Sequence, residues 1–146
     1  NNKKLYNPDV TNLSSIIAKR PFVRKALKSF QKNFIKKSRL VVVEGRDIGT
    51  KIMPEADLKI FFTCSIKKKA RRRLKEFRLM NKDISLKQVE KALIKRDKED
   101  IKRKISPLIM PKNAVLVDTT KLSINQMRAK LINLVSNAVQ KKYGNI

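Results

Sequence analysis

The sequence predicts a doubly wound α/β domain with a parallel sheet, and three observations lead to that prediction. Three short runs, residues 40–44, 58–63 and 114–118, are apolar without the alternation of a half-exposed strand. Amphipathic helical segments lie before, between and after these runs, and 41% hydrophobic residues in a chain of 146 suffice for one packed core. Strands of this kind are buried on both faces by helices, and such sheets bind ligands beyond the carboxyl ends of their strands.

The N-terminal part predicts two helices, a strand and a loop. Asn7-Pro8-Asp9 is typical of a helix start, and Pro21 opens a second helix. Apolar residues at helical spacing define the expected inner faces, namely Leu13, Ile16 and Ile17 in the first helix and Val23, Leu27, Phe30 and Phe34 in the second. The strand at 40–44 then leads into a loop at 45–57 that contains two glycines.

The C-terminal part predicts two strands and three helices with explicit start signals. The strand at 58–63 is followed by Ser65, which can cap a helix from residue 66 to about 80, and residues 81–83 break that helix. Ser85 with Gln88 forms a capping-box pattern for a helix that reaches about residue 104. After the strand at 114–118, Ser123 with Gln126 caps the last helix.

Charge and composition exclude several function classes. The 37 Lys and Arg residues against 12 Asp and Glu give a net charge of +25, which suggests a polyanion partner, although lysines on helix faces are usually solvated surface. One Cys and no His exclude a disulfide framework, a Cys/His zinc cluster and His-based catalysis. No apolar run approaches the roughly 20 residues of a membrane span, so we expect a soluble, cytoplasmic protein. The chain begins with Asn1 rather than Met, as a piece of a longer protein would.

Two clusters of charged residues are candidates for chemistry. Residues 44–50, EGRDIGT, place two acids and an Arg directly after the first predicted strand, where Arg46 could grip a phosphate; the alternative is a structural turn whose charges pair with neighbours. The helix from Ser85 carries Leu86, Val89 and Leu93 on one face, which then continues as Arg96, Asp100 and Arg103. That half of the helix either lines a polar cleft or is an exposed end with i,i+4 ion pairs.

These pieces together resemble the bacterial-type cytidylate kinase family, nucleoside monophosphate kinases acting on CMP and dCMP. The matching stretches are VVVEGRDIGTKIMPEADLKIFF, KKARRRL, KRDKEDIKRKISPL and AVLVDTTKLS, in the family's order. The resemblance implies a P-loop nucleoside-monophosphate-kinase-like doubly wound sheet. Residues 1–146 would form one partial domain with the acceptor-nucleotide part, a lid at about 72–103, and the C-terminal strand and helix.

The resemblance also implies roles for individual residues. Ser15, Arg24 and Asp47 would read the cytosine ring, and Arg96 and Asp100 would hold the ribose. Arg46 and Arg103 would clamp the CMP phosphate, while Arg72, Arg96 and Arg103 would form the catalytic set, with Arg72 on the ATP phosphates. Glu44 would approach Mg²⁺ through water. No role is assigned to Glu99, where relatives can carry Arg.

The family's N-terminal strand and Walker A loop, which bind ATP, are expected to be missing from this chain, so we expect it to be inactive alone. The implied partners are CMP, dCMP and ATP with Mg²⁺, with no membrane and no specific nucleic acid, and a monomer when complete. A kinase for UMP is a rival within the same class. A basic nucleic-acid-binding module, or a non-catalytic remnant on a kinase-derived fold, is the alternative from another class.

Overall fold

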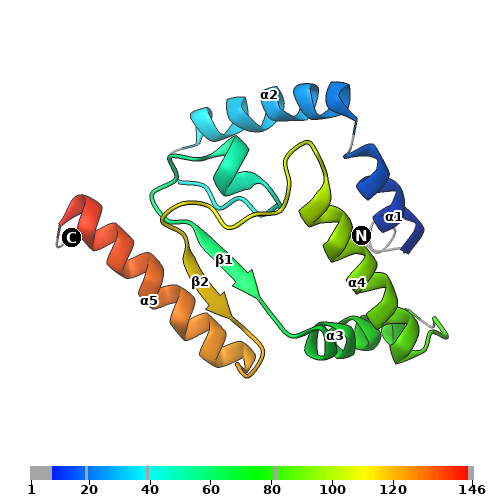
Figure 1. The fold of residues 1–146 in the computed structure, drawn as a ribbon. Helices are drawn as coiled ribbons and strands as arrows, with labels where there is room; N and C mark the ends of the chain where they lie inside the picture. Colours follow the sequence, from blue (N-terminus) through cyan, green and yellow to red (C-terminus); the bar gives the residue numbers. More distant parts are fainter. Residues whose placement is uncertain (1–7, 19, 39, 81, 145–146) are drawn as a thin grey trace.

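A computed structural model describes residues 8–18, 20–38, 40–80 and 82–144 (Figure 1). Asn7 and Asn81, predicted from the sequence at the start and the end of helices, lie outside these ranges. The described chain is α/β, with five α-helices and one two-stranded parallel sheet. The elements in order are α1 (Pro8–Ile17), α2 (Pro21–Lys37), the π-helical turn η2 (Ile48–Ile52), β1 (Ile60–Thr63), α3 (Ile66–Leu79), α4 (Leu86–Lys102), β2 (Val115–Asp118) and α5 (Ile124–Tyr143).

The predicted helix starts are confirmed where a side chain caps the first turn. Ser65 Oγ accepts a hydrogen bond from the Lys68 amide at the start of α3. A complete capping box opens α4, in which the Ser85 amide donates to Gln88 Oε1 at 2.8 Å and the Gln88 amide donates to Ser85 Oγ at 3.3 Å. The same arrangement opens α5. Because each cap satisfies otherwise unpaired backbone groups locally, the sequence alone predicts these boundaries well.

The sheet is smaller than predicted. β1 and β2 pair in parallel, with Ile60 beside Val115 and Thr63 beside Asp118, and Val117 is fully buried. The predicted strand at 40–44 is wrong: residues 41–44 have no regular structure, and Val42 is 99% exposed. A strand is stabilised by hydrogen bonds to a neighbour, and no described segment pairs with residues 40–44. The doubly wound sheet is therefore present here only as one parallel pair.

The main apolar cluster lies between α3 and α4. Ala70, Phe77 and Val89 are buried there, and Leu74, Ile84, Leu86 and Leu93 pack against them, which confirms the predicted apolar face of α4. The predicted inner faces of α1 and α2 are wrong in this structure, since Leu13 is 55% exposed and Phe30 is 71% exposed. No buried residue belongs to α2, because no described element covers its apolar face. Within the described ranges, no helix combines the length and the apolar character that crossing a membrane requires.

Candidate active site

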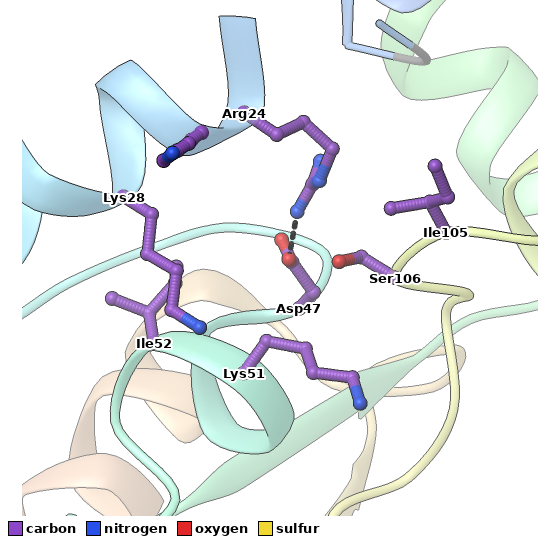
Figure 2. Close-up of a pocket in the computed structure, with 8 residues that line it drawn as sticks. Arg24, Lys28, Asp47, Lys51, Ile52, Ile105 and Ser106 are labelled. Atoms are coloured by element: carbon purple, nitrogen blue, oxygen red, sulfur yellow. Dashed lines mark hydrogen bonds and ion pairs between the residues drawn. The ribbon is translucent and has the colours of Figure 1, made fainter. Parts of the chain in front are cut away.

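A pocket of about 240 Å³ opens between α2, η2 and the loop that follows α4 (Figure 2). Its walls carry four basic side chains, one acid, two isoleucines and a serine. They are Arg24, Lys25, Lys28, Asp47, Lys51, Ile52, Ile105 and Ser106. A pocket with this lining suits a small ligand that has polar edges and an anionic group.

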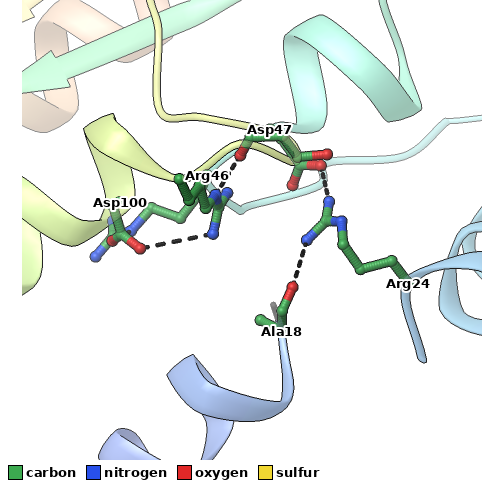
Figure 3. A network of polar contacts seen from close by, with 7 residues as sticks. Ala18, Arg24, Arg46, Asp47 and Asp100 are labelled. Atoms are coloured by element: carbon green, nitrogen blue, oxygen red, sulfur yellow. Dashed lines mark hydrogen bonds and ion pairs between the residues drawn. The ribbon is translucent and has the colours of Figure 1, made fainter. Parts of the chain in front are cut away.

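Arg24 and Asp47, separated by 23 residues in the chain, meet at this pocket as an ion pair (Figures 2 and 3). Asp47 is 8% exposed and lies at the start of η2, where its carbonyl oxygen accepts from the Lys51 amide at 2.8 Å. Arg24 Nη1 also donates to the Ala18 carbonyl oxygen at 3.3 Å, which ties the end of α1 to the pair. Two residues predicted to read one base are thus adjacent, one a donor and the other an acceptor.

A second network joins the segment directly before η2 to α4 (Figure 3). Arg46 Nε donates to Asp100 Oδ2 at 2.9 Å, and Arg103 Nη1 lies 3.6 Å from Asp100 Oδ1. Asp100 is only 5% exposed, and its carbonyl oxygen accepts from the Leu108 amide at 2.8 Å. Asp100 therefore contacts a residue 54 positions away, as expected for a polar cleft rather than for an exposed helix end.

Two guanidinium nitrogens near this network are buried and unpaired within the described chain, Arg96 Nε and Arg103 Nη2. The pKa of Arg96 is lowered, chiefly because burial penalises its charged form and next because Arg46 repels it. Asp100 partly offsets this effect by raising the Arg96 pKa. Buried donors without acceptors and crowded positive charge are both relieved by an anion, so this arrangement can bind a phosphate group.

Arg72 lies at the carboxyl end of the sheet rather than in either network described above. Its Nη1 donates to Thr119 Oγ1 at 3.2 Å and its Nη2 donates to the Thr119 carbonyl oxygen at 2.9 Å. Thr119 follows β2, is 5% exposed, and donates through Oγ1 to the Thr63 carbonyl oxygen at 3.1 Å. The guanidinium of Arg72 is thereby held at the edge of a parallel sheet where ligands usually bind.

The remaining sequence-predicted positions are not brought into a common site. Glu44 is exposed in the irregular segment before η2. The described ranges hold no group of three or more His, Cys, Asp and Glu residues arranged for a metal ion. Ser15 belongs to α1, but its side chain lies outside what the structure describes.

Of the eight residues that line the pocket, only Arg24 and Asp47 were predicted as site residues; the other six are Lys25, Lys28, Lys51, Ile52, Ile105 and Ser106. Ser106 stands immediately before Pro107 in the KRDKEDIKRKISPL stretch, so it was inside a matching motif without being singled out. Lys51 follows the GRDIGT motif directly, but nothing in the sequence separates it from the many solvated lysines.

Comparison with known proteins gives one consistent result. A family model described as Cytidylate kinase matches residues 1–137. The cytidylate kinase of Thermotoga neapolitana is 39% identical over 138 residues, which are 94% of this chain and 62% of that protein. That of Carboxydothermus hydrogenoformans is 43% identical over 128 residues, which are 88% of this chain and 57% of that protein. The chain thus spans about three-fifths of the length of these two relatives.

The same similarity extends to a bifunctional protein. A bifunctional pantoate ligase/cytidylate kinase of Trichodesmium erythraeum is 44% identical over 127 residues, which are 86% of this chain and 24% of that protein.

Proposed function

Since the chain belongs to the cytidylate kinase family, we propose that it forms the acceptor-nucleotide part of an enzyme that phosphorylates CMP and dCMP. The observation that carries this proposal is the continuity of two polar networks through consecutive residues. Asp47 belongs to the Arg24 pair and lines the pocket, while Arg46 belongs to the Asp100–Arg103 network. One mononucleotide could therefore place its base against the first network and its phosphate against the second.

The base end has the polarity that cytosine requires. The exocyclic amine of cytosine donates hydrogen bonds, and its N3 and O2 accept them. Asp47 would accept from the amine, while Arg24 and, by family resemblance, Ser15 would contact the ring acceptors. The Asp47 carboxylate would repel the oxygen that uracil carries in place of the amine, which favours CMP over UMP.

The phosphate end has donors without partners in the described chain. Arg46 and Arg103 would clamp the CMP phosphate, and Arg96 would approach the transferred phosphoryl group. The buried, unpaired Arg96 Nε and Arg103 Nη2 support this assignment, because an incoming phosphate oxygen would satisfy them. Asp100 would hold the ribose hydroxyls with the lone pairs that its two arginines leave available.

The reaction is an in-line displacement in which positioning and charge neutralisation dominate. A phosphate oxygen of CMP forms a bond to the γ-phosphorus of ATP, the bond to the β,γ-bridging oxygen breaks, and ADP leaves. Arg72 would meet the ATP phosphates from a lid at about residues 72–103, whose closure would exclude water.

The acidic residues of the described chain could contribute only a minor share of the Mg²⁺ ligands. This ion binds mainly to substrate phosphates and water, and it would neutralise phosphate charge during transfer. Glu44 is exposed and belongs to no group of three or more metal-ligating side chains within the described ranges, so it would contact the ion through water.

We further propose that this chain alone does not catalyse at a normal rate. Residues 1–146 contain no G-x-x-x-x-G-K pattern, the loop that would cradle the ATP phosphates. The free edge of β1 and the unpaired, apolar segment at 40–44 suit an additional strand outside the described ranges. In a coupled assay, turnover by this chain near that of a full-length family member would contradict the proposal.

Calorimetric titration of the chain with CMP tests the acceptor-site proposal. We expect saturable binding that Asp47→Asn and Arg103→Ala each reduce by at least about tenfold, as for lost hydrogen bonds to charged groups. Lys130→Ala, an exposed lysine on α5, is the matched control and should leave CMP affinity unchanged. Absence of CMP binding, together with salt-sensitive binding of RNA that Lys130→Ala also weakens, would favour the basic nucleic-acid-binding module instead.

A further inference from the structure

Ser106 has a backbone conformation that its residue type disfavours. Its φ is +53°, in the left-handed region, and in the described chain only Asn113 among other non-glycine residues also has a positive φ. Asn adopts this region readily, whereas Ser does so less often, and a residue before proline is normally extended. Such conformations persist where the surroundings hold them, and they cluster at ligand sites.

Residues before and after Ser106 connect it to the network of Arg46, Asp100 and Arg103, and these contacts hold its backbone conformation. Arg103 Nε donates to the Ser106 carbonyl oxygen, and the Leu108 amide donates to the Asp100 carbonyl oxygen. Arg103 and Asp100 are themselves adjacent as an ion pair. The backbone of Ser106 is therefore part of the structure that positions the predicted phosphate clamp.

The side chain of Ser106 belongs to the base pocket instead. Ser106 is 8% exposed, and its hydroxyl points towards Asp47 across the pocket wall (Figure 2). Among the side chains that line the pocket, the lysines and Arg24 can only donate hydrogen bonds, Asp47 accepts them, and the isoleucines do neither. Ser106 contributes the one neutral group of this wall that can accept a hydrogen bond next to Asp47.

We propose that Ser106 is a specificity-determining residue, whose Oγ accepts a hydrogen bond from the exocyclic amine of the pyrimidine beside Asp47. This inference rests on the proposed acceptor site. The amine of cytosine carries two hydrogens, so Asp47 can take one and Ser106 Oγ the other. Uracil presents an oxygen at that position; because the Asp47 carboxylate repels this oxygen, UMP would not bring it within hydrogen-bonding reach of the Ser106 hydroxyl.

The test is the ratio of CMP affinity to UMP affinity, measured by calorimetry on the whole chain. Ser106→Ala should weaken CMP binding about threefold to tenfold, the usual effect of one lost neutral hydrogen bond, and leave UMP binding unchanged. Ser106→Gly also removes the hydroxyl but accepts a positive φ without penalty, so it should show the same loss of preference in a more stable protein. Equal effects of the two variants assign the preference to the hydroxyl and not to the backbone.

Three outcomes would overturn the proposal in distinguishable ways. If Ser106→Gly keeps the wild-type ratio while Ser106→Ala does not, the backbone conformation and not the hydroxyl determines preference. If both variants weaken CMP and UMP equally, or change neither, Ser106 does not contact the amine although the acceptor site stands. If the folded wild-type chain binds no CMP, this inference and the proposed function fail together.

Discussion

The α3–α4 pair buries Ala70, Phe77 and Val89 against one another, whereas residues 8–57 contribute only Ile52 to the buried hydrophobic side chains of the described chain. Charged contacts help join the N-terminal region to the rest, among them Arg46 with Asp100 and Lys142 with Asp57. Burial of apolar surface stabilises the first region, while ion pairs orient the second. The chain thus combines a self-contained helical pair, which includes the proposed lid, with a ligand-facing segment whose apolar faces remain exposed.

The largest expected effect comes from the core of the helical pair. Phe77→Ala should destabilise the α3–α4 region by about 3–5 kcal/mol, because the ring is 7% exposed and its removal leaves a cavity. Phe30→Ala is the matched control in the other region, where the ring is 71% exposed, and it should change stability by less than about 0.5 kcal/mol. Urea unfolding followed by circular dichroism measures both, and equal losses would remove the contrast between the regions.

A smaller effect is expected where the two regions meet. Asp100→Asn should cost about 1–3 kcal/mol, because it weakens the ion pair with Arg46 across the junction and leaves the Arg103 guanidinium, 9% exposed, without its charge partner. Asp97→Asn is the comparison, since Asp97 pairs with Lys69 at 2.8 Å within the α3–α4 pair and is 27% exposed. That pair should be worth less than about 1 kcal/mol. A larger loss from Asp97→Asn than from Asp100→Asn, by thermal unfolding, would contradict the assigned importance of the junction.

The smallest effect concerns acid stability at the end of the sheet. Hydrogen bonds from the hydroxyl and the amide of Thr120 hold the pKa of Asp118 below its usual value. Because the folded state has the lower pKa, this contribution is present above the ordinary Asp pKa and is lost as the pH falls through the folded value. In Asp118→Asn, the free energy of unfolding should therefore fall slightly less than in the wild type as the pH is lowered. An unchanged dependence of this free energy on pH, measured by urea unfolding, would contradict the prediction.

Features that depend on residues close together in the sequence were predicted correctly, whereas features that depend on distant segments were not. The caps at Ser65, Ser85 and Ser123 were predicted correctly, since a cap and its partner lie three residues apart. The strand at 40–44 was predicted from an apolar run, which reports strand propensity but not whether a partner strand is present. The left-handed backbone of Ser106 has no sequence signal, because it depends on the carbonyl contact with Arg103.

In the candidate site, too, the sequence identified individual residues but not how they pair. The charged face of Arg96, Asp100 and Arg103 was readable from helical spacing, and the family resemblance named Arg24, Arg46 and Asp47. The pairing of Arg24 with Asp47 and of Arg46 with Asp100 required the fold, since these partners are 23 and 54 residues apart. The roles of these residues towards CMP remain predictions that the binding experiments address.

By itself, the sequence determined the helices, two of the strands, the charge and the family to which the chain belongs. These depend on local patterns of caps, periodicity and motifs, which act within a few residues. The tertiary structure decided which acids neutralise which arginines, where two guanidinium nitrogens stay unpaired, and that Ser106 lines the base pocket. Those features arise only when distant segments come together, because burial and charge pairing are properties of the folded chain.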